Sequence, residues 1–244
     1  MVNSFNLTLS SQQAAVAVTV SQTTQLPEAL AQLGLSHSHP VLVIVGGASL
    51  ISEVDFLRIQ NLFVEVLAPI AQNLAAYVVD GGTDAGVMRL MGNARSQING
   101  DFPLIGVAPL AKVILPGQTV LSEDATGLEP HHTHFVLVPG NNWGDESPWI
   151  VNVATLLANK APSITVLING GEISFIDALN SIIAGRLVMV MAGSGRTADK
   201  LASALDRDTT DERAQELAAS GLLQKIDLAA KRDDLINKIT QLLA

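Results

Sequence analysis

Four glycine-rich segments, each directly after an apolar run, are the residues of this chain best suited to bind an anion. They are Gly46-Gly47, Asp80-Gly81-Gly82-Thr83-Asp84-Ala85-Gly86, Asn169-Gly170-Gly171-Glu172 and Gly193-Ser194-Gly195-Arg196. Glycine permits sharp turns, and a helix that starts after such a turn exposes backbone N–H groups and the positive end of its dipole. Phosphates bind at such helix starts, and Arg196 adds a planar guanidinium suited to bidentate contact. Together the segments favour a nucleotide pocket over four unrelated turns.

Acidic residues form a second set of candidates. Glu172 and Asp177 would be the acids of the pocket if the protein cleaved an N-glycosidic bond. Asp177 stands three residues after Ser174, however, and this capping-box spacing favours a structural role at a helix start. Hard oxygen ligands that could hold Mg²⁺ beside a pyrophosphate are carried by Asp80, Asp84, Asp145 and Glu146. No resident cofactor is required by these patterns.

Histidines and a tryptophan complete the candidates. The segment His131-His132-Thr133-His134 offers imidazoles, but histidines that lead into a strand point in different directions, and no cysteine completes a tetrahedral zinc set. We therefore predict no metal site, and expect His134 to flank the strand and His132 to approach the pocket. Trp143 could stack on a base, with packing in a surface loop as an equal alternative.

These residues need a frame of strands and helices to position them. Apolar, β-branched runs predict strands over residues 15–20, 41–45, 76–79, 104–107, 135–138, 164–168 and 187–191. Most are continuously apolar, which is typical of strands covered on both faces. Between them, Ser147 and Ser174 are helix-start signals, and Pro69 is expected to kink or end a helix. The alternation predicts an α/β protein with a Rossmann-like, mostly parallel sheet and helices on both faces.

The last part of the chain has a different character. From Asp206 it is charged and rich in Ala and Leu, with no strand pattern, so we divide the chain into a nucleotide-binding domain (1–205) and a C-terminal helical extension (206–244). One or two amphipathic helices there are suggested by Leu222, Ile226, Leu228, Leu235, Ile239 and Leu242. We expect these helices to pack on the domain, with pairing to a second copy as the alternative.

Residues 193–198 also fit the loose Gly-x-Gly-x-x-Ala dinucleotide pattern. The usual unit continues into a strand with a ribose-binding acid about 20 residues later. Since no such strand is predicted here, an ordinary NAD-dependent dehydrogenase is not favoured.

Composition narrows the classes of function. The 244 residues include 23 acidic and 14 basic ones, and the net charge of -9 repels nucleic-acid backbones. Aromatic residues make up 4% of the chain, so platforms for stacking bases are not expected either. The sequence has no cysteine, no signal-peptide pattern and no apolar run near the ~20 residues that a membrane span needs. We expect a cytoplasmic protein that binds a small molecule and neither nucleic acid nor membrane.

Five longer motifs occur in a recognisable order. They are VVDGGTDAGVMRLMG (78–92), PLIGVAP (103–109), LEPHHTHFVLV (128–138), VLINGG (166–171) and GSGRTADKL (193–201). In them the chain resembles the SLOG superfamily, and within it the LSDAT domain, which occurs at the cytosolic N-terminus of TRPM (melastatin) channels and in free-standing prokaryotic relatives. The resemblance implies a Rossmann-like fold, a stand-alone protein without the channel, and a site for ADP-ribose, NAD or a related nucleotide. The expected ligand site comprises Gly46, Gly47, Gly81, Gly82, Thr83, Gly86, Gly170, Gly171, Glu172, Gly193, Ser194, Gly195 and Arg196.

The superfamily resemblance also raises an enzymatic alternative. LOG-type phosphoribohydrolases cleave the N-glycosidic bond of a nucleoside monophosphate and carry a Pro-Gly-Gly-x-Gly-Thr-x-x-Glu segment. Here residues 169–177 correspond to it, with Asp177 in place of the final Glu and without the Pro and the third Gly. The upstream Arg-Lys pair of those enzymes has no counterpart in HHTHFVLVPGNNWGDE. Ligand binding is therefore favoured over a nucleotide N-glycosidase or NAD hydrolase, and an oligomeric assembly module is the second alternative.

Overall fold

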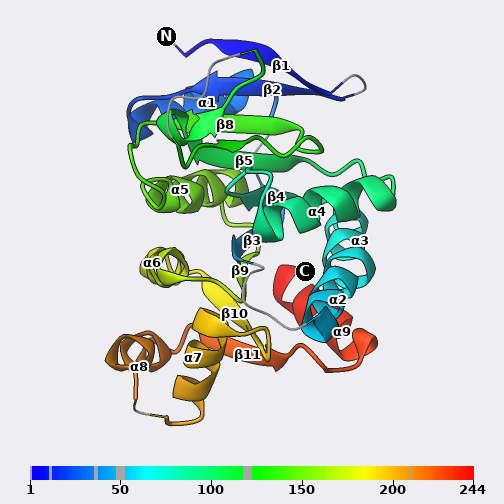
Figure 1. Ribbon diagram of the computed structural model, residues 1–244, viewed down its shortest axis with the longest axis vertical. Helices are drawn as coiled ribbons and strands as arrows, with labels where there is room; N and C mark the ends of the chain where they lie inside the picture. Colours follow the sequence, from blue (N-terminus) through cyan, green and yellow to red (C-terminus); the bar gives the residue numbers. More distant parts are fainter. Residues whose placement is uncertain (1, 11–12, 36–37, 48–52, 118–122, 209) are drawn as a thin grey trace.

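The computed structural model describes residues 2–10, 13–35, 38–47, 53–117, 123–208 and 210–244. Within these ranges nine strands form one sheet in the order β1-β2-β8-β5-β4-β3-β9-β10-β11 (Figure 1). Neighbouring strands are parallel except for β1, which pairs with β2 in the antiparallel sense. The strands are β1 Ser4–Ser10, β2 Gln13–Thr19, β3 Val41–Gly46, β4 Tyr77–Asp80, β5 Leu104–Pro109, β8 His134–Val138, β9 Ser163–Ile168, β10 Leu187–Ala192 and β11 Leu223–Asp227. The predicted Rossmann-like, mostly parallel α/β fold is confirmed.

The central strands are buried because their sequences are apolar throughout. All residues of β4 and β5 are buried, and only the last residue of β3 is partly accessible. A strand that is apolar on both faces requires cover on both sides. Two very short strands, β6 (Val113–Ile114) and β7 (Thr126–Gly127), pair with each other outside the main sheet.

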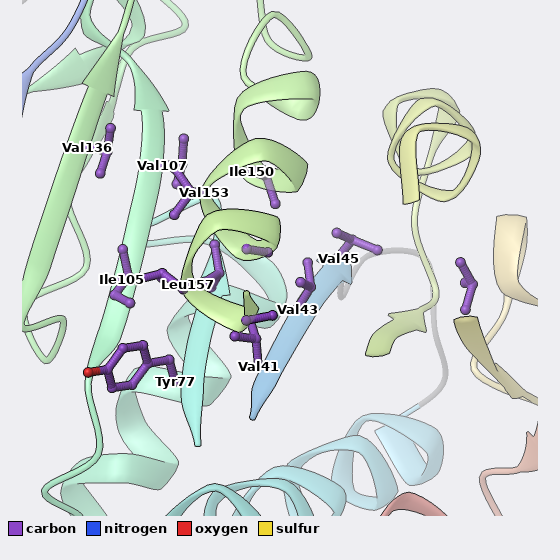
Figure 2. Packing of buried hydrophobic residues seen from close by; sticks show 14 of the residues in the cluster. Val41, Val43, Val45, Tyr77, Ile105, Val107, Val136, Ile150, Val153 and Leu157 are labelled. Carbon is purple, nitrogen blue, oxygen red and sulfur yellow. The ribbon is translucent and has the colours of Figure 1, made fainter. Parts of the chain in front are cut away.

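Helices cover both faces of the sheet. One layer contains α1 Leu26–Gln32, α5 Ser147–Ala158, α6 Glu172–Ile183, α7 Arg196–Leu205 and α8 Glu212–Ala219. The opposite layer contains α2 Glu53–Leu62, the π-helical turn η2 Phe63–Leu67, α3 Ala68–Asn73, α4 Gly86–Gln97 and α9 Arg232–Leu243. In Figure 2, α5 packs beside β3 and β5 through Ile150, Val153 and Leu157. No helix within the described ranges has the length and apolar character needed to cross a bilayer.

The order of the strands creates a switch point at the centre of the sheet. From β3 the chain adds β4, β5 and β8 on one side; it then returns to place β9 on the other side of β3 and continues outward through β10 and β11. The connections after β3 and β9 therefore diverge, which leaves a crevice at the carboxyl ends of these two strands.

Two helices begin earlier than the sequence signals predict. Helix α6 starts at Glu172 with extended Gly171 as its N-cap, so Ser174 lies inside the first turn. The prediction that Ser174 caps this helix and that Asp177 completes a capping box is wrong. Helix α5 includes Ser147 itself, with Glu146 at the N-cap position. In α6 the glycine turn already supplies the non-helical residue that leads into the helix.

Pro69 does not end its helix, but a π turn distorts the helix directly before it, where a kink or an end was predicted. The helical path continues from α2 through η2 into α3, where Pro69 stands in the first turn. The Ala68 N–H donates to the Phe63 carbonyl, an i→i+5 bond that defines a π turn. This local change of hydrogen-bond register accommodates a residue that has no N–H to donate.

The segment after Asp206 contains a strand that the sequence pattern did not predict. Strand β11 pairs in parallel with β10, from Val188 opposite Leu223 to Ala192 opposite Asp227. The predicted apolar residues of this segment do pack within the chain. Leu228, Leu235 and Ile239 are buried in the core between the sheet and the layer of α2, α3, α4 and α9, and Ile226 and Leu242 pack against that core. The absence of a strand was predicted wrongly because β11 is a short edge strand in which only Leu223 is buried, so it has no continuously apolar run.

Candidate functional site

A cavity of about 470 Å³ lies at the switch point; we refer to it as the switch-point cavity. It is formed where β3, β4 and β9 end, together with the start of α5 and the first residue of α7. Of the residues predicted from the sequence, those that line it are Gly46, Gly47, Gly81, Thr83, Gly171, Glu172 and Arg196. Three of the four glycine-rich segments therefore meet at this cavity, and the fourth reaches it through Arg196.

Two helices start at the cavity wall without a side-chain cap. The N-cap residues are Ala85 for α4 and Gly171 for α6, and neither makes a side-chain cap hydrogen bond. Helix α8, away from the cavity, is capped by Asp211, whose side chain accepts from the Ala214 N–H at 3.2 Å. The positive dipole ends of α4 and α6 thus face the cavity without a carboxylate or hydroxyl cap of their own.

The side chain of Arg196 lies over the start of α6. A Cβ built on Gly171 would be 3.0 Å from Nη2 of Arg196, so a side chain at position 171 would press on the guanidinium. Arg196 itself has φ of 54°, in the left-handed region that L-residues seldom occupy. A cation at a helix N-terminus meets a dipole end of the same sign. An anion bound between them would be stabilised by both.

The rest of the fourth glycine segment stays behind the cavity wall. Ser194 is buried, and its Oγ accepts from the Asn169 N–H at 2.8 Å and donates to the Met191 carbonyl at 2.6 Å. The first N–H groups of α7 are also occupied, since Thr197 and Ala198 donate to the carbonyls of residues 170 and 169. This turn therefore ties β9 to β10 and presents Arg196, while Gly193, Ser194 and Gly195 do not line the cavity.

Asp227 occupies the place of a ribose-binding acid relative to this turn, at the end of β11. Its Oδ1 would lie 3.8 Å from a Cβ on Gly193, but it accepts from the Ala229 N–H at 2.7 Å. A parallel strand thus follows this turn, but about 20 residues on, where the dinucleotide pattern expects it, the chain forms helix α8. The α7 N–H groups that would hold a pyrophosphate moreover donate to carbonyls of the chain.

Three other predicted glycines also lie outside the cavity lining: Gly82, Gly86 and Gly170. They shape the turns that lead to it. A Cβ on Gly46, by contrast, would lie 1.9 Å from the Ile168 carbonyl oxygen, and its φ of 134° is unfavourable for other residues. This close approach brings the ends of β3 and β9 together and sets the width of the crevice.

Two buried carboxyl groups also line the cavity. Asp177 comes from the second turn of α6, and its Oδ1 accepts from the Ser147 Oγ at 2.6 Å. Glu146 precedes α5, and its Oε2 accepts from the Gly144 N–H at 2.7 Å. Burial, with the nearby charge of Glu146, raises the pKa of Asp177 to about 7. Burial also raises the pKa of Glu146, partly offset by its backbone hydrogen bonds.

Trp143 and Glu172 complete the polar and aromatic edge of the site. The Trp143 side chain lines the cavity, and its Nε1 donates to the Asp124 carbonyl at 3.2 Å. Glu172 is exposed and accepts from Arg213, with 2.6 Å between Oε2 and Nη1. Its pairing with Arg213 leaves Asp177 and Glu146 as the buried acids of the cavity.

The histidine segment forms an ion network beside the site. His132 is fully buried; its Nδ1 lies 2.7 Å from Glu129 Oε2 and its Nε2 lies 2.8 Å from Asp80 Oδ1. Burial lowers the pKa of His132, but the two carboxylates outweigh burial and raise it to about 9. The expectation that His132 approaches the pocket is wrong, because His132 does not line the cavity. Its hydrogen bond to Asp80, the residue before Gly81, joins the end of β4 to the segment before β8.

The same network fixes the second glycine segment. The Gly82 N–H donates to Asp80 Oδ1 at 2.7 Å, and the Glu129 N–H donates to the Gly82 carbonyl at 3.0 Å. Gly92 of α4 gives Glu129 its space, because a Cβ there would lie 2.1 Å from that carboxylate. His134 begins β8, as expected, with its Nδ1 2.7 Å from Thr133 Oγ1.

The four acids considered for Mg²⁺ serve separate local contacts. Asp80 belongs to the histidine network, and Asp84 pairs with Arg89 at 2.6 Å. Asp145 accepts from the N–H groups of residues 141 and 142, and Glu146 from that of Gly144. Across the described ranges no group of three or more His, Asp or Glu side chains is placed to hold a metal ion.

Several lining residues were missed by the sequence reasoning: Ile44, Val45, Ala85, Met88, Thr126, Ile150, Ile173 and Ser174. Most of them are neighbours of predicted residues, at the end of β3 or in the first turns of α4 and α6. Extension of each glycine segment by one helical turn would have found these. Thr126 follows the long break in the chain and carries no signal of its own.

Comparison with known proteins agrees with this architecture. Residues 39–237 match the family model described as SLOG in TRPM, prokaryote (LSDAT_prok). The transient receptor potential cation channel subfamily M member 2 of Rattus norvegicus is 26% identical over 181 residues, which cover 60% of this chain and 12% of the channel subunit. The Mus musculus protein of the same name is 26% identical over 204 residues, covering 69% of this chain and 13% of that subunit. The family match spans most of the chain, which therefore belongs to the prokaryotic SLOG-in-TRPM (LSDAT) family.

Proposed function

We propose that the protein binds a nucleotide-derived ligand of the ADP-ribose or NAD group in the switch-point cavity. The observation that carries this proposal is the guanidinium of Arg196 at the uncapped, positive end of α6, inside a cavity of about 470 Å³. Membership of the LSDAT family and the similarity to the TRPM member 2 channels support a nucleotide-related ligand.

A phosphate group matches the electrostatics of this part of the cavity. The phosphate would lie between Arg196 and the first turn of α6, with the start of α4 and Thr83 close by. A charge-assisted hydrogen bond to a phosphate contributes about 1.5–3 kcal/mol, and the low local dielectric of a crevice strengthens it. The overall charge of -9 opposes polyanions at long range, but it does not cancel these local donors.

Calorimetric titration with ADP-ribose, NAD, cyclic ADP-ribose, AMP and ATP tests the proposal. We expect saturable binding of at least one of these ligands by the unaltered protein. The substitution Arg196→Ala should weaken that binding by about 1–3 kcal/mol, or about 5–150-fold, because one charged phosphate contact is lost. Absence of binding by all five ligands would refute the function.

Arg58→Ala is the matched control. Arg58 is an exposed arginine of α2 that pairs with Asp55 at 3.0 Å and does not line the switch-point cavity. Its removal lowers the overall positive charge by the same amount as Arg196→Ala, so the two variants share any long-range effect. Equal affinities for the two variants would withdraw the role given to Arg196.

An N-glycosidase is the second candidate, and the state of Asp177 favours it. With a pKa of about 7, this carboxyl is protonated in a large fraction of molecules at neutral pH. A protonated acid in the cavity could give its proton to the departing base while the bond between the base and the sugar C1 breaks, and water would then add to C1. Nicotinamide leaves NAD as a neutral base and takes no proton, so this role of Asp177 applies to nucleoside monophosphates.

Incubation with NAD and with nucleoside monophosphates separates the two candidates. Free base, detected by chromatography, indicates hydrolysis, and its loss in Asp177→Asn would assign the acid. The asparagine keeps the shape and the acceptor oxygen for Ser147 but has no proton of suitable acidity to donate. Intact nucleotide after prolonged incubation, together with measurable binding, would leave ligand binding as the function.

A further inference from the structure

The buried acids of the cavity have binding capacity that the protein itself does not use. Within the described residues, Asp177 engages Oδ1 with Ser147, and Glu146 engages Oε2 with Gly144. A carboxylate offers about four acceptor sites. Asp177 uses one of them for Ser147, while Glu146 accepts from the Gly144 N–H and from its own backbone N–H. Both residues are only 8% exposed, and both line the cavity. Each acid therefore has acceptor sites left for a ligand.

The position of the pair is fixed by two helices that pack together. Ser147 begins α5, and Asp177 lies in the second turn of α6, so their 2.6 Å hydrogen bond joins the two helices. Gly144 holds Glu146 from the preceding loop. A pair mounted in this way offers two acceptors in a set geometry, with little rotamer freedom left to lose on binding.

The chemistry of the pair selects the kind of group that it can bind. A phosphate or carboxylate would add negative charge to two buried acids and is disfavoured. A neutral group with two adjacent O–H donors can donate one hydrogen bond to each acid without added charge. In a nucleotide, the neutral group of this type is the vicinal diol of ribose. The anionic part of the same ligand belongs with Arg196 and the start of α6, which also line the cavity.

We propose that Glu146 and Asp177 bind the free 2- and 3-hydroxyl groups of a ribose, so that the cavity selects nucleotides whose ribose carries no phosphate or deoxy position. This inference rests on the proposed nucleotide function and specifies which part of the ligand the acid pair contacts and which part Arg196 contacts. The sugar would thus be bound by an acid that precedes α5 and an acid of α6, and not by an acid at the end of a strand.

Calorimetry with ADP-ribose, its 2′-deoxy and 2″-deoxy forms and its 2′-phosphate tests the inference. The two deoxy ligands lack a hydroxyl on one ribose each, so one of them should bind the unaltered protein at least 10-fold more weakly than ADP-ribose. If the adenosine ribose is the one bound, the 2′-phosphate should bind more weakly than the 2′-deoxy form. Binding of both deoxy forms within twofold of ADP-ribose would overturn the inference and leave the proposed function standing.

The variants Glu146→Gln and Asp177→Asn supply the second readout. Each should reduce the preference for ADP-ribose over the sensitive deoxy ligand to below threefold, since an amide replaces one acceptor oxygen by a donor. A preference unchanged in both variants would also overturn the inference. Arg196→Ala should weaken all ligands by a similar factor and keep the preference. Failure of all five nucleotides to bind the unaltered protein would refute the proposed function, and the inference with it.

Discussion

Replacement of His132 by glutamine should remove a specific pH dependence of stability. The imidazole lies between Glu129 and Asp80 at 2.7 and 2.8 Å, with no solvent exposure of its side chain. A charged histidine there joins the segment before β8 to the end of β4. Glutamine retains some hydrogen-bonding capacity but carries no positive charge.

The size and sign of the effect follow from the pKa of His132. It is about 9 in the folded protein against 6.5 for an ordinary histidine, so proton binding favours the folded state. At 1.36 kcal/mol per pH unit this difference corresponds to about 3 kcal/mol. The contribution is fully present below pH 6.5, decreases between pH 6.5 and 9, and is lost above pH 9.

Urea unfolding followed by circular dichroism, at pH values from 6.5 to 9.5, measures this term. The free energy of unfolding of the unaltered protein should fall by about 3 kcal/mol more than that of His132→Gln over this range. His134→Gln is the control, because burial lowers the pKa of His134 to about 4 and its folded state binds no proton in this range. Parallel curves for the unaltered protein and His132→Gln would refute the assignment of a buried, charged His132.

Two further predictions concern residues of the cavity. Asp177→Asn should stabilise the protein at pH 8 and lose this advantage below pH 4, measured by urea unfolding, because a carboxyl whose folded pKa is raised to about 7 destabilises the fold increasingly between pH 3.8 and 7. Gly46→Ala should lower the free energy of unfolding by about 3 kcal/mol or more, since its Cβ would meet the Ile168 carbonyl at 1.9 Å with φ of 134°. Gly127→Ala, where a Cβ meets nothing within 4 Å, should change it by less than about 0.5 kcal/mol and is the control.

The core of the fold could be predicted because its strands carry a strong local signal. Continuously apolar runs such as β3 and β9 are incompatible with an exposed surface, and each of the seven predicted runs overlaps a strand of the sheet to within one residue at its ends or lies inside it. The two edge strands gave no such signal. β1 (SFNLTLS) alternates polar and apolar residues, a pattern that short loops and helix ends also show, and β11 (LQKID) has only two apolar residues, Leu223 and Ile226.

The candidate site was predictable only where the chain itself brings residues together. Glycine segments after parallel strands must meet at one edge of the sheet, so Gly46, Gly81 and Gly171 were found together with Arg196. Contacts between distant segments left no trace in the sequence. His132 and Asp80 are 52 residues apart, and the hydrogen bond from Ser147 to Asp177 spans 30.

Asp177 shows how a small error in a helix boundary changes the interpretation of a residue. With the helix start placed at Ser174, Asp177 has the spacing of a capping acid and no chemical role. The actual start at Glu172 turns the same carboxyl into the cavity, where burial raises its pKa to about 7. Helix starts after glycine-rich turns are ambiguous by about two residues in sequence, and this ambiguity is enough to reverse the assignment.

The parallel pairing of β11 has a consequence for any shortened form of this protein. A chain that ends at Leu205 would lose β11 and leave the backbone N–H and C=O groups along one side of β10 unpaired. It would also uncover the apolar surface now covered by Leu235, Ile239 and Leu243. Self-association of such a fragment would reflect a newly exposed sheet edge. The last 39 residues therefore cover a surface that would otherwise favour aggregation.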